Sequence, residues 1–339
     1  MRFRRPRPLT TRPRVSVVIP CYRYGHYLPA AVASAFDQSG VDVEVIIVDD
    51  ASPDDSAATA RELAAGDDRI TVLVHELNAG HIATYNDGLA LATGDYVTLV
   101  SADDLLTRDS LTRAVALMEA HPRVGFVYGY ARSFAGEPEE TSGRVRNWSI
   151  YPGHQWLTLA ARRGRCFISS PEAVMRREAL AQTDRYDPRL PHSGDFDMWL
   201  RTAARWDVGR INGPVQAHYR VHEANMHLTT YQGWVTDLVE RRRTFQILFD
   251  ERAVDVPEVQ GLRPVAARAL AREARRRARV ALYDGDAVEA EAYLAFAAET
   301  YPAERIHVSR LLPPAKRVVL GVERVSHHLR WRRERRYGT

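Results

Sequence analysis

The sequence predicts a protein of the α/β class, with a mainly parallel central sheet flanked by helices and a helical region after it. Three observations support this prediction. Short apolar runs rich in β-branched residues alternate with segments of helical period through about residue 120. Acidic or polar residues follow several of these runs, where strands would end. From about residue 230 the chain changes to long alanine-rich segments of helical period.

The first part of the chain alternates strand and helix, which predicts β–α–β units and a parallel sheet. Ser52 is the expected cap of the second helix, because Pro53 follows it at the first helical position. The expected strands are residues 15–19, 43–48, 70–74 and 96–100, and the expected helices are residues 28–38, 52–65 and 82–92.

Later segments are mixed and then helical. Further strands are expected at residues 124–130 and 215–221, and a helix begins near Asp197. A helical hairpin is expected around the Asp-Gly-Asp turn at residues 284–286. The domain prediction is a basic disordered arm at 1–13, an α/β domain at 14–228, and a helical region with a basic tail at 229–339.

Charge is unevenly distributed along the 339 residues, whose formal net charge is +4. Residues 1–14 and residues 316–336 each carry +6, so the remainder carries −8. No nucleic-acid recognition motif accompanies the basic ends, which argues against nucleic acid as a partner. There is no apolar run of membrane-spanning length and no secretory signal, which predicts a cytoplasmic protein. Two cysteines, Cys21 and Cys166, exclude a disulfide scaffold.

Two pairs of acids follow predicted strands, Asp49-Asp50 and Asp103-Asp104. Ligands of parallel sheets bind at the carboxyl ends of the strands, where these pairs would lie. Carboxylates there can hold Mg²⁺ or Mn²⁺ on a diphosphate, or accept hydrogen bonds from a sugar or base. The glycine-rich loops of P-loop NTPases and dinucleotide dehydrogenases are missing, which disfavours both classes.

These residues belong to an ordered set of motifs that resembles family 2 glycosyltransferases of the GT-A fold. The resemblance covers about residues 14–228. Its segments are residues 17–22, 48–54, 78–80, Asn86, 94–96, 101–104, Ser193 to Arg201 and Tyr219 to Asn225.

The resemblance implies a role for each matched residue. It identifies Asp195 as the general base that takes a proton from the acceptor hydroxyl. It implies that Asp103, with the neighbouring Asp104 and with His222, holds the metal on the diphosphate. The implied nucleotide-sugar-binding residues are Pro20, Tyr22, Asp49, Asp50, Asn78, Gly80, Asn86 and Asp103.

The function that follows from the resemblance is an inverting, hexosyltransferase-like reaction in glycan, cell-envelope polysaccharide or metabolite biosynthesis. The expected donor is UDP- or dTDP-linked, the cofactor Mg²⁺ or Mn²⁺, and the acceptor a hydroxyl such as that of a lipid-linked glycan. Two alternatives stay open: a sugar nucleotidyltransferase, and a sugar-nucleotide-binding protein without turnover. The second is kept open by Ser101 and Gly194, which stand where the family has acids.

Simpler interpretations accompany these assignments. Asp195 could cap its helix, His222 could be a structural hydrogen-bonding residue, and Trp199 is expected in the core. The basic ends are either solvated tails or a surface that contacts anionic lipid at the inner face of the cell membrane.

Overall fold

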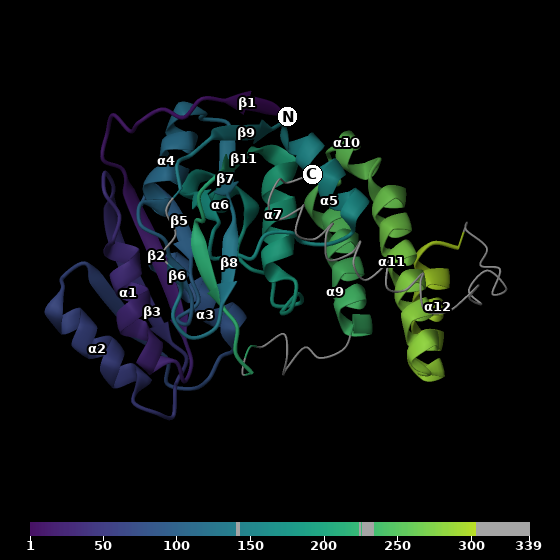
Figure 1. Cartoon of the computed structure of the whole chain (residues 1–339), viewed down its shortest axis with the longest axis horizontal. Coiled ribbons are helices and arrows are strands. Elements are labelled where there is room, and N and C mark those ends of the chain that lie inside the picture. Colours follow the sequence, from purple (N-terminus) through teal and green to yellow (C-terminus); the bar gives the residue numbers. More distant parts are fainter. Residues whose placement is uncertain (140–142, 224, 226–233, 303–339) are drawn as a thin grey trace. The chain divides into compact units, whose positions relative to one another are not determined.

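The computed structural model describes residues 1–139, 143–223, 225 and 234–302 (Figure 1). Contacts group the chain into two units. The first contains residues 1–156 and 168–225, and the second contains residues 157–167 and the chain from 226 onward. The division falls inside helix α5 (Gly153–Arg163). The predicted basic tail at 316–339 lies outside the described residues.

The first unit is built on a nine-stranded sheet with the order β1-β9-β11-β7-β10-β5-β2-β3-β4. The four strands β4, β3, β2 and β5 are parallel, as predicted, and β11 also runs parallel to β7. Between these two groups β10 is antiparallel to both neighbours. The strands are β1 (Arg2–Arg4), β2 (Arg14–Cys21), β3 (Asp42–Asp49), β4 (Ile70–Val74), β5 (Tyr96–Leu99), β7 (Val124–Tyr128), β9 (Asn147–Tyr151), β10 (Val174–Arg176) and β11 (Asp207–Asn212).

The amino terminus differs from the prediction of a disordered arm over residues 1–13. Residues Arg2–Arg4 form β1, which pairs antiparallel with β9 at the edge of the sheet. Arg4 lies opposite Trp148 in this pairing. Arginine and proline content indicated disorder, but a short edge strand needs no buried side chain, because backbone hydrogen bonds to its neighbour hold it. All three residues of β1 are exposed.

A second, three-stranded sheet has the order β6-β12-β8. Its strands are β6 (Leu105–Leu106), β8 (Ala131–Phe134) and β12 (Ala217–Arg220). Because β6 directly follows the acid pair after β5, pairing of β12 with β6 brings the Tyr219–Asn225 motif beside that pair.

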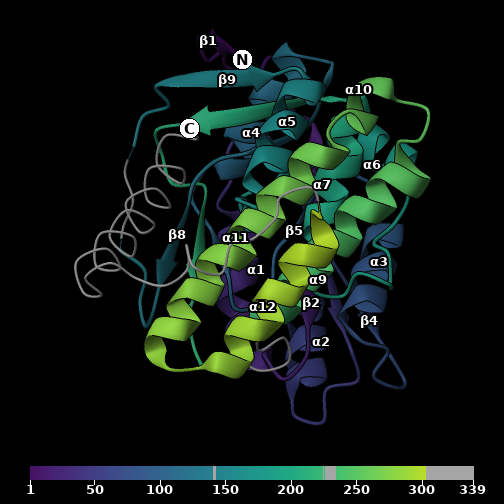
Figure 2. The ribbon, with the colours of Figure 1, turned by 90° about the vertical axis from the view of Figure 1, so that its right-hand side faces the viewer.

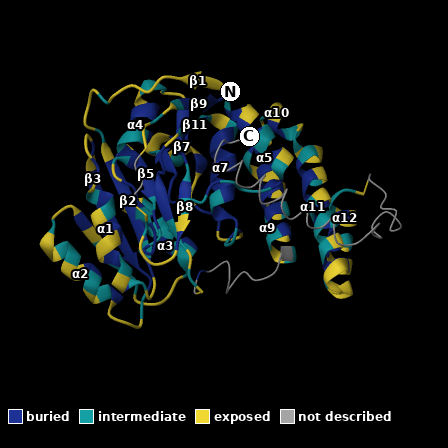
Figure 3. Cartoon of the chain, viewed as in Figure 1, coloured by how far each residue is buried: buried dark blue, intermediate teal, exposed yellow. Residues whose placement is uncertain are grey.

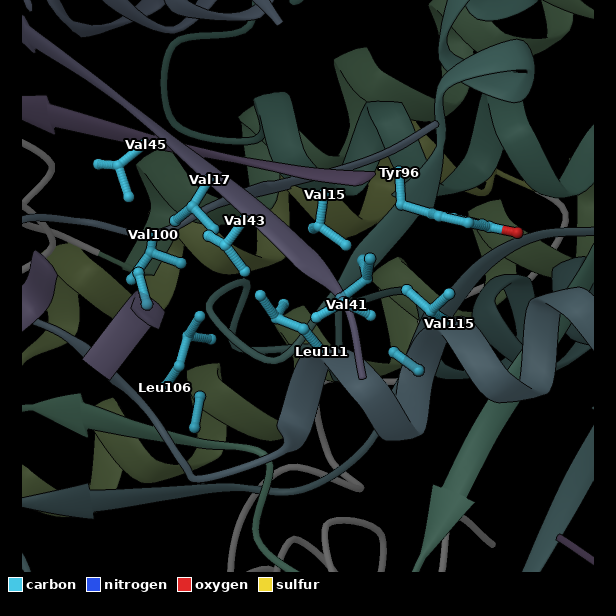
Figure 4. Close-up of a cluster of buried hydrophobic side chains, with 14 of the residues drawn as sticks. Val15, Val17, Val41, Val43, Val45, Tyr96, Val100, Leu106, Leu111 and Val115 are labelled. Carbon is cyan, nitrogen blue, oxygen red and sulfur yellow. The ribbon is translucent and has the colours of Figure 1, made fainter. Parts of the chain in front are cut away.

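Helices cover both faces of the parallel strands, and the alternation of side chains along each strand explains why. Val15, Val17 and Ile19 of β2 point into one large apolar cluster, which Figure 4 shows together with Leu111 and Val115 of α4. Val18 of β2 points to the opposite face, with Ile46 and Val48 of β3. Buried strands with helices on each side form the layers of the fold (Figure 3).

The helices of the first unit match most predicted segments. The structure corrects the second predicted helix, since α2 begins at Ser56 and Ser52 instead accepts a hydrogen bond from the backbone N–H of Arg23. It also begins α7 three residues before Asp197. The helices are η1 (Gly25–Tyr27), α1 (Leu28–Phe36), α2 (Ser56–Gly66), α3 (His81–Leu91), α4 (Ser110–Ala120), α6 (Arg177–Thr183) and α7 (Gly194–Arg205).

The buried carboxylate of Glu44 joins the amino ends of β2 and β3 to the turn before β5. It accepts hydrogen bonds from the Ser16 hydroxyl, from Thr93 N at 2.8 Å and from Gly94 N at 3.0 Å. Arg14 pairs with its other oxygen. Burial alone would raise the pKa of Glu44, but the hydrogen bonds from Ser16 and Thr93 outweigh burial and lower it.

Helix α3 approaches β2 and β3 closely at Gly88. A Cβ atom at this position would lie 2.4 Å from Cγ1 of Val18 and 3.1 Å from Cγ2 of Val48. Only glycine therefore allows α3 to rest at this depth on the sheet.

The second unit contains the predicted helical hairpin, and Figure 2 shows its two helices side by side. A buried charge cluster ties the hairpin to α9, since Arg241 pairs with Asp237 at 2.7 Å and with Glu273 at 3.2 Å. None of the helices in the described residues combines the length and apolar character of a membrane span. The elements are α9 (Trp234–Ile247), η2 (Leu248–Arg252), α10 (Pro257–Gln260), α11 (Arg263–Asp284) and α12 (Ala287–Thr300).

Replacing Gly88 tests the packing of α3. Alanine has the higher helix propensity, yet we expect Gly88→Ala to lower the free energy of unfolding by about 2 kcal/mol, because its methyl group overlaps Val18. The matched control is Gly66→Ala at the end of α2, where a Cβ meets nothing within 4 Å. Urea unfolding measures both, and equal or higher stability of Gly88→Ala would contradict the packing argument.

The lowered pKa of Glu44 predicts a pH dependence of stability. A depressed folded-state pKa adds stability that is complete above the unfolded value, about 4.3, and is lost as the pH falls from there through the lower folded-state value. We therefore expect Glu44→Gln to cost about 1–3 kcal/mol at pH 7 and much less at pH 3. Urea titrations of both proteins at the two pH values measure this, and a pH-independent difference would contradict it.

Candidate functional site

Asp49 ends β3 and Asp50 follows it, but their carboxylates have different surroundings. Asp49 is fully buried; one oxygen accepts a hydrogen bond from Ser52 N at 3.0 Å, and the second has no hydrogen-bond partner. A buried carboxylate oxygen without a donor is unusual and costly. Asp49 therefore has one carboxylate oxygen, Oδ2, that can still accept a hydrogen bond at the carboxyl end of β3.

Asp50 is instead engaged by the loop that leads into α3. Its two oxygens accept hydrogen bonds from Ala79 N at 2.7 Å and Gly80 N at 2.9 Å, and Asn78 donates to its backbone carbonyl at 3.1 Å. Gly80 has a φ of +83°, a conformation that favours glycine. Asp50, Asn78 and Gly80 thus lie together, and their hydrogen bonds shape the loop.

His75 completes this arrangement and was not among the predicted site residues. Its imidazole lies between two carboxylates, with Nδ1 2.9 Å from Asp50 and Nε2 3.2 Å from Asp87. It follows β4, so its place at the end of a predicted strand was the signal that could have identified it.

The second acid pair follows β5, the strand next to β2. Asp104 is almost fully buried, and its Oδ1 accepts a hydrogen bond from Arg220 N at 2.8 Å. Burial, together with the charge of Asp103, raises the pKa of Asp104 well above its usual range. The Arg220 guanidinium also donates to the Asp103 carbonyl at 2.8 Å and lies over the Tyr27 ring.

His222 reaches the same turn from the segment after β12. Its Nε2 lies 2.9 Å from Oδ2 of Asp103, and its ring is flanked by Tyr24 and Tyr27. Burial, followed by the charge of Asp103, raises the pKa of Tyr24 to about 12. The resemblance assigned Asp103 and His222 to one site, and the structure brings their side chains into contact.

The predicted set of three metal-ligating side chains is only partly assembled. Within residues 1–139, 143–223, 225 and 234–302, no three His, Cys, Asp or Glu side chains are grouped to hold a metal. Oδ1 of Asp104 accepts a hydrogen bond from Arg220 N, and the part of Asp104 in metal binding stays a prediction. Asp103 and His222 still fit a divalent cation, because such ions often take few protein ligands and fill their remaining positions with substrate phosphates.

Asp195 lies in the first turn of α7 and is half-buried. Its carboxylate accepts hydrogen bonds from the Ser170 hydroxyl and, at 2.8 Å, from the Tyr186 hydroxyl. These donors come from other segments, so Asp195 does not use its side chain to cap its own helix. Trp199, on the same helix, is buried against Phe126 as expected.

The remaining predicted site residues are less closely grouped. Asn86 of α3 exchanges two hydrogen bonds with the backbone of Tyr186, at 2.8 and 2.9 Å. Pro20 is half-buried near the end of β2, and Tyr22 is 43% exposed with Arg23 over its ring. Nothing in these contacts tests their role in donor binding, which stays a prediction.

Sequence reasoning missed Ser170, Tyr186 and Arg220 as members of the site. Arg220 lay inside a recognised motif, whereas Ser170 and Tyr186 lie between motifs. No local pattern marks a serine or tyrosine that meets an aspartate through the tertiary fold.

Two solved structures share the fold of this chain. A mannosyltransferase from Pyrobaculum calidifontis, in complex with GDP-Man and Mn²⁺, is 20% identical with a TM-score of 0.53, covering 89% of this chain and 90% of its own. TarS 1–349 of S. aureus, in complex with UDP-GlcNAc, is 16% identical with a TM-score of 0.54, covering 85% and 92%. The chain therefore has the GT-A fold.

Sequence comparison then gives the family. Residues 16–183 match the model of glycosyl transferase family 2. An uncharacterised glycosyltransferase of Nostoc sp. is 27% identical over 218 residues, which cover 64% of this chain and 67% of that relative. The chain thus contains a domain of glycosyltransferase family 2 and is a glycosyltransferase.

Neighbouring aspartates give a matched test of the site. We expect Asp50→Asn to lower the free energy of unfolding by about 1–3 kcal/mol, because an amide nitrogen would face a backbone N–H. Asp49→Asn should cost little, since one Asp49 oxygen has no donor to lose. Thermal and urea unfolding measure both. If the two variants are equally stable, the structural role of Asp50 is wrong.

Proposed function

We propose that this protein moves a sugar from a nucleoside-diphosphate donor to a hydroxyl acceptor, with inversion at the anomeric carbon. One observation carries the proposal. Asp49 and Asp50 lie at the carboxyl end of β3 and Asp103 follows β5, the two parallel strands that flank β2, with His222 2.9 Å from Asp103. Ligands of parallel sheets bind at this edge, where the acidic groups favour a metal-bound diphosphate.

Donor recognition is assigned to the first acid pair. The unpartnered oxygen of Asp49 is an acceptor for a donor group of the base or ribose. Pro20 and Tyr22 flank Cys21, which lies opposite Asp49 in the sheet register. Asp50 contributes by holding the loop at Asn78 and Gly80 in shape. A UDP- or dTDP-linked sugar is the proposed donor.

Diphosphate binding is assigned to Asp103 and His222, which would hold Mg²⁺ or Mn²⁺. The metal, when bound, would neutralise charge on the departing diphosphate. Arg220 keeps Asp103 in place through its carbonyl, so the carboxylate remains directed toward His222.

Proton removal is assigned to Asp195. Each oxygen of its carboxylate already accepts a hydrogen bond from one hydroxyl group. Each also retains a second lone pair, which can take the proton of the hydroxyl that attacks the sugar. A single base suffices for one in-line displacement, because the diphosphate departs without needing a proton.

The acceptor and the cellular location belong to the same proposal. A lipid-linked glycan of the cell envelope is the proposed acceptor, reached from the cytoplasmic face of the membrane. The exposed Phe3, flanked by the exposed Arg2 and Arg4, supports peripheral contact with anionic lipid, because an apolar ring between arginines suits that interface.

An assay of the donor reaction tests this function. We expect metal-dependent release of nucleoside diphosphate in the presence of acceptor, abolished by EDTA and restored by Mn²⁺. Asp195→Asn should lower the transfer rate about 10²- to 10⁴-fold while donor affinity changes little. The matched control is Asp68→Asn, an exposed aspartate, which should act as the wild type does.

The alternatives predict other outcomes. Binding of nucleotide sugars without turnover, across a panel of acceptors, would identify a binding protein. Formation of a nucleotide sugar from a sugar phosphate would identify a nucleotidyltransferase. Full activity of Asp195→Asn would remove Asp195 from the reaction.

A further inference from the structure

Ser170 holds an unfavourable backbone conformation beside the candidate base. Its φ is +80°, a left-handed value that L-residues other than Asn and Asp rarely adopt. The next residue is Pro171, which further restricts the backbone of the residue before it. Conformations of this kind cost free energy and persist where the surrounding structure imposes them.

Two hydrogen bonds hold Ser170 in this backbone conformation. Ala173 N donates to the Ser170 carbonyl at 2.9 Å, which closes a tight turn. Thr98, buried on β5, donates its hydroxyl to the Ala173 carbonyl at 2.8 Å. The turn is therefore fixed to the central sheet.

This conformation places the Ser170 hydroxyl on Oδ2 of Asp195, while the Tyr186 hydroxyl donates to Oδ1. Tyr186 is itself held by its two backbone hydrogen bonds to Asn86. Burial, followed by the charge of Asp195, raises the pKa of Tyr186 well above its ordinary value, so its hydroxyl remains a proton donor at neutral pH. The carboxylate is thus held at both oxygens from separate segments.

A small cavity of about 20 Å³ adjoins this group, with room for about one water molecule. It gives the carboxylate space to change orientation if either hydroxyl is removed. Thr98, Ser170, Ala173, Tyr186 and Asp195 all line it.

We propose that Ser170 and Tyr186 are positioning residues that fix the orientation of the Asp195 carboxylate for proton abstraction, and that the strained turn at Ser170 serves this purpose. The inference rests on the proposed role of Asp195 as the base. It assigns a function to two residues of the fold that the family motifs do not include.

Two substitutions of Ser170 separate this role from a structural one. Ser170→Gly and Ser170→Ala both remove the hydroxyl, but only glycine relieves the left-handed strain. We expect kcat to fall about 10-fold in both, with the KM for the donor changed less than twofold. The glycine variant should nevertheless unfold about 2–4 °C above the alanine variant.

Tyr186→Phe provides the second arm, since it keeps the ring and removes only the hydroxyl. We expect a similar loss of kcat, and a loss in Ser170→Gly/Tyr186→Phe that approaches that of Asp195→Asn. Steady-state kinetics and thermal unfolding of the full chain measure these values.

The outcomes distinguish this inference from the function on which it rests. Wild-type kcat in Ser170→Gly and in Tyr186→Phe, with Asp195→Asn inactive, would overturn the positioning role alone. Loss of kcat in proportion to loss of thermal stability would also overturn it. Activity of Asp195→Asn equal to that of the wild type would overturn the proposed base, and the positioning role with it.

Discussion

The buried carboxylate of Glu44 is the interaction on which the site geometry depends. By accepting hydrogen bonds from Ser16, Thr93 N and Gly94 N, it fixes the amino ends of β2 and β3 and the turn before β5. The parallel register then determines where the same strands end. A group near the amino ends of the strands thereby sets the relative positions of the acidic pairs at their carboxyl ends.

Most polar groups of the site bind the protein itself. Asp50 holds a loop, Asn86 holds Tyr186, and Asp104 holds Arg220. Such groups cost free energy when left unsatisfied, so the fold uses them to arrange their neighbours. Two groups are best suited to a ligand. One is Asp49, whose second oxygen has no hydrogen-bond partner, and the other is the pair formed by Asp103 and His222.

The sequence predicts the parallel half of the sheet well because each strand there is mostly apolar and β2, β3 and β5 are buried along most of their length. It also predicts the contact between Asp103 and His222, through motif order. It does not predict β10 or β1, which are three residues long and carry no periodic signal. Nor does it predict the hydrogen bond between Asp104 and Arg220 N. The sequence does not distinguish two adjacent aspartates, and this bond depends on the pairing of β12 with β6.

The place of β1 has a consequence for synthesis of the chain. Arg2–Arg4 are synthesised well before their partner strand, because Arg4 pairs with Trp148 in β9. At about 5–20 residues per second, the terminus waits about ten seconds or longer for its neighbour. During that time it is an unpaired segment of the kind that promotes aggregation between nascent chains. The arginines of this segment repel other copies of it, and charge of this kind on an edge strand disfavours pairing between chains.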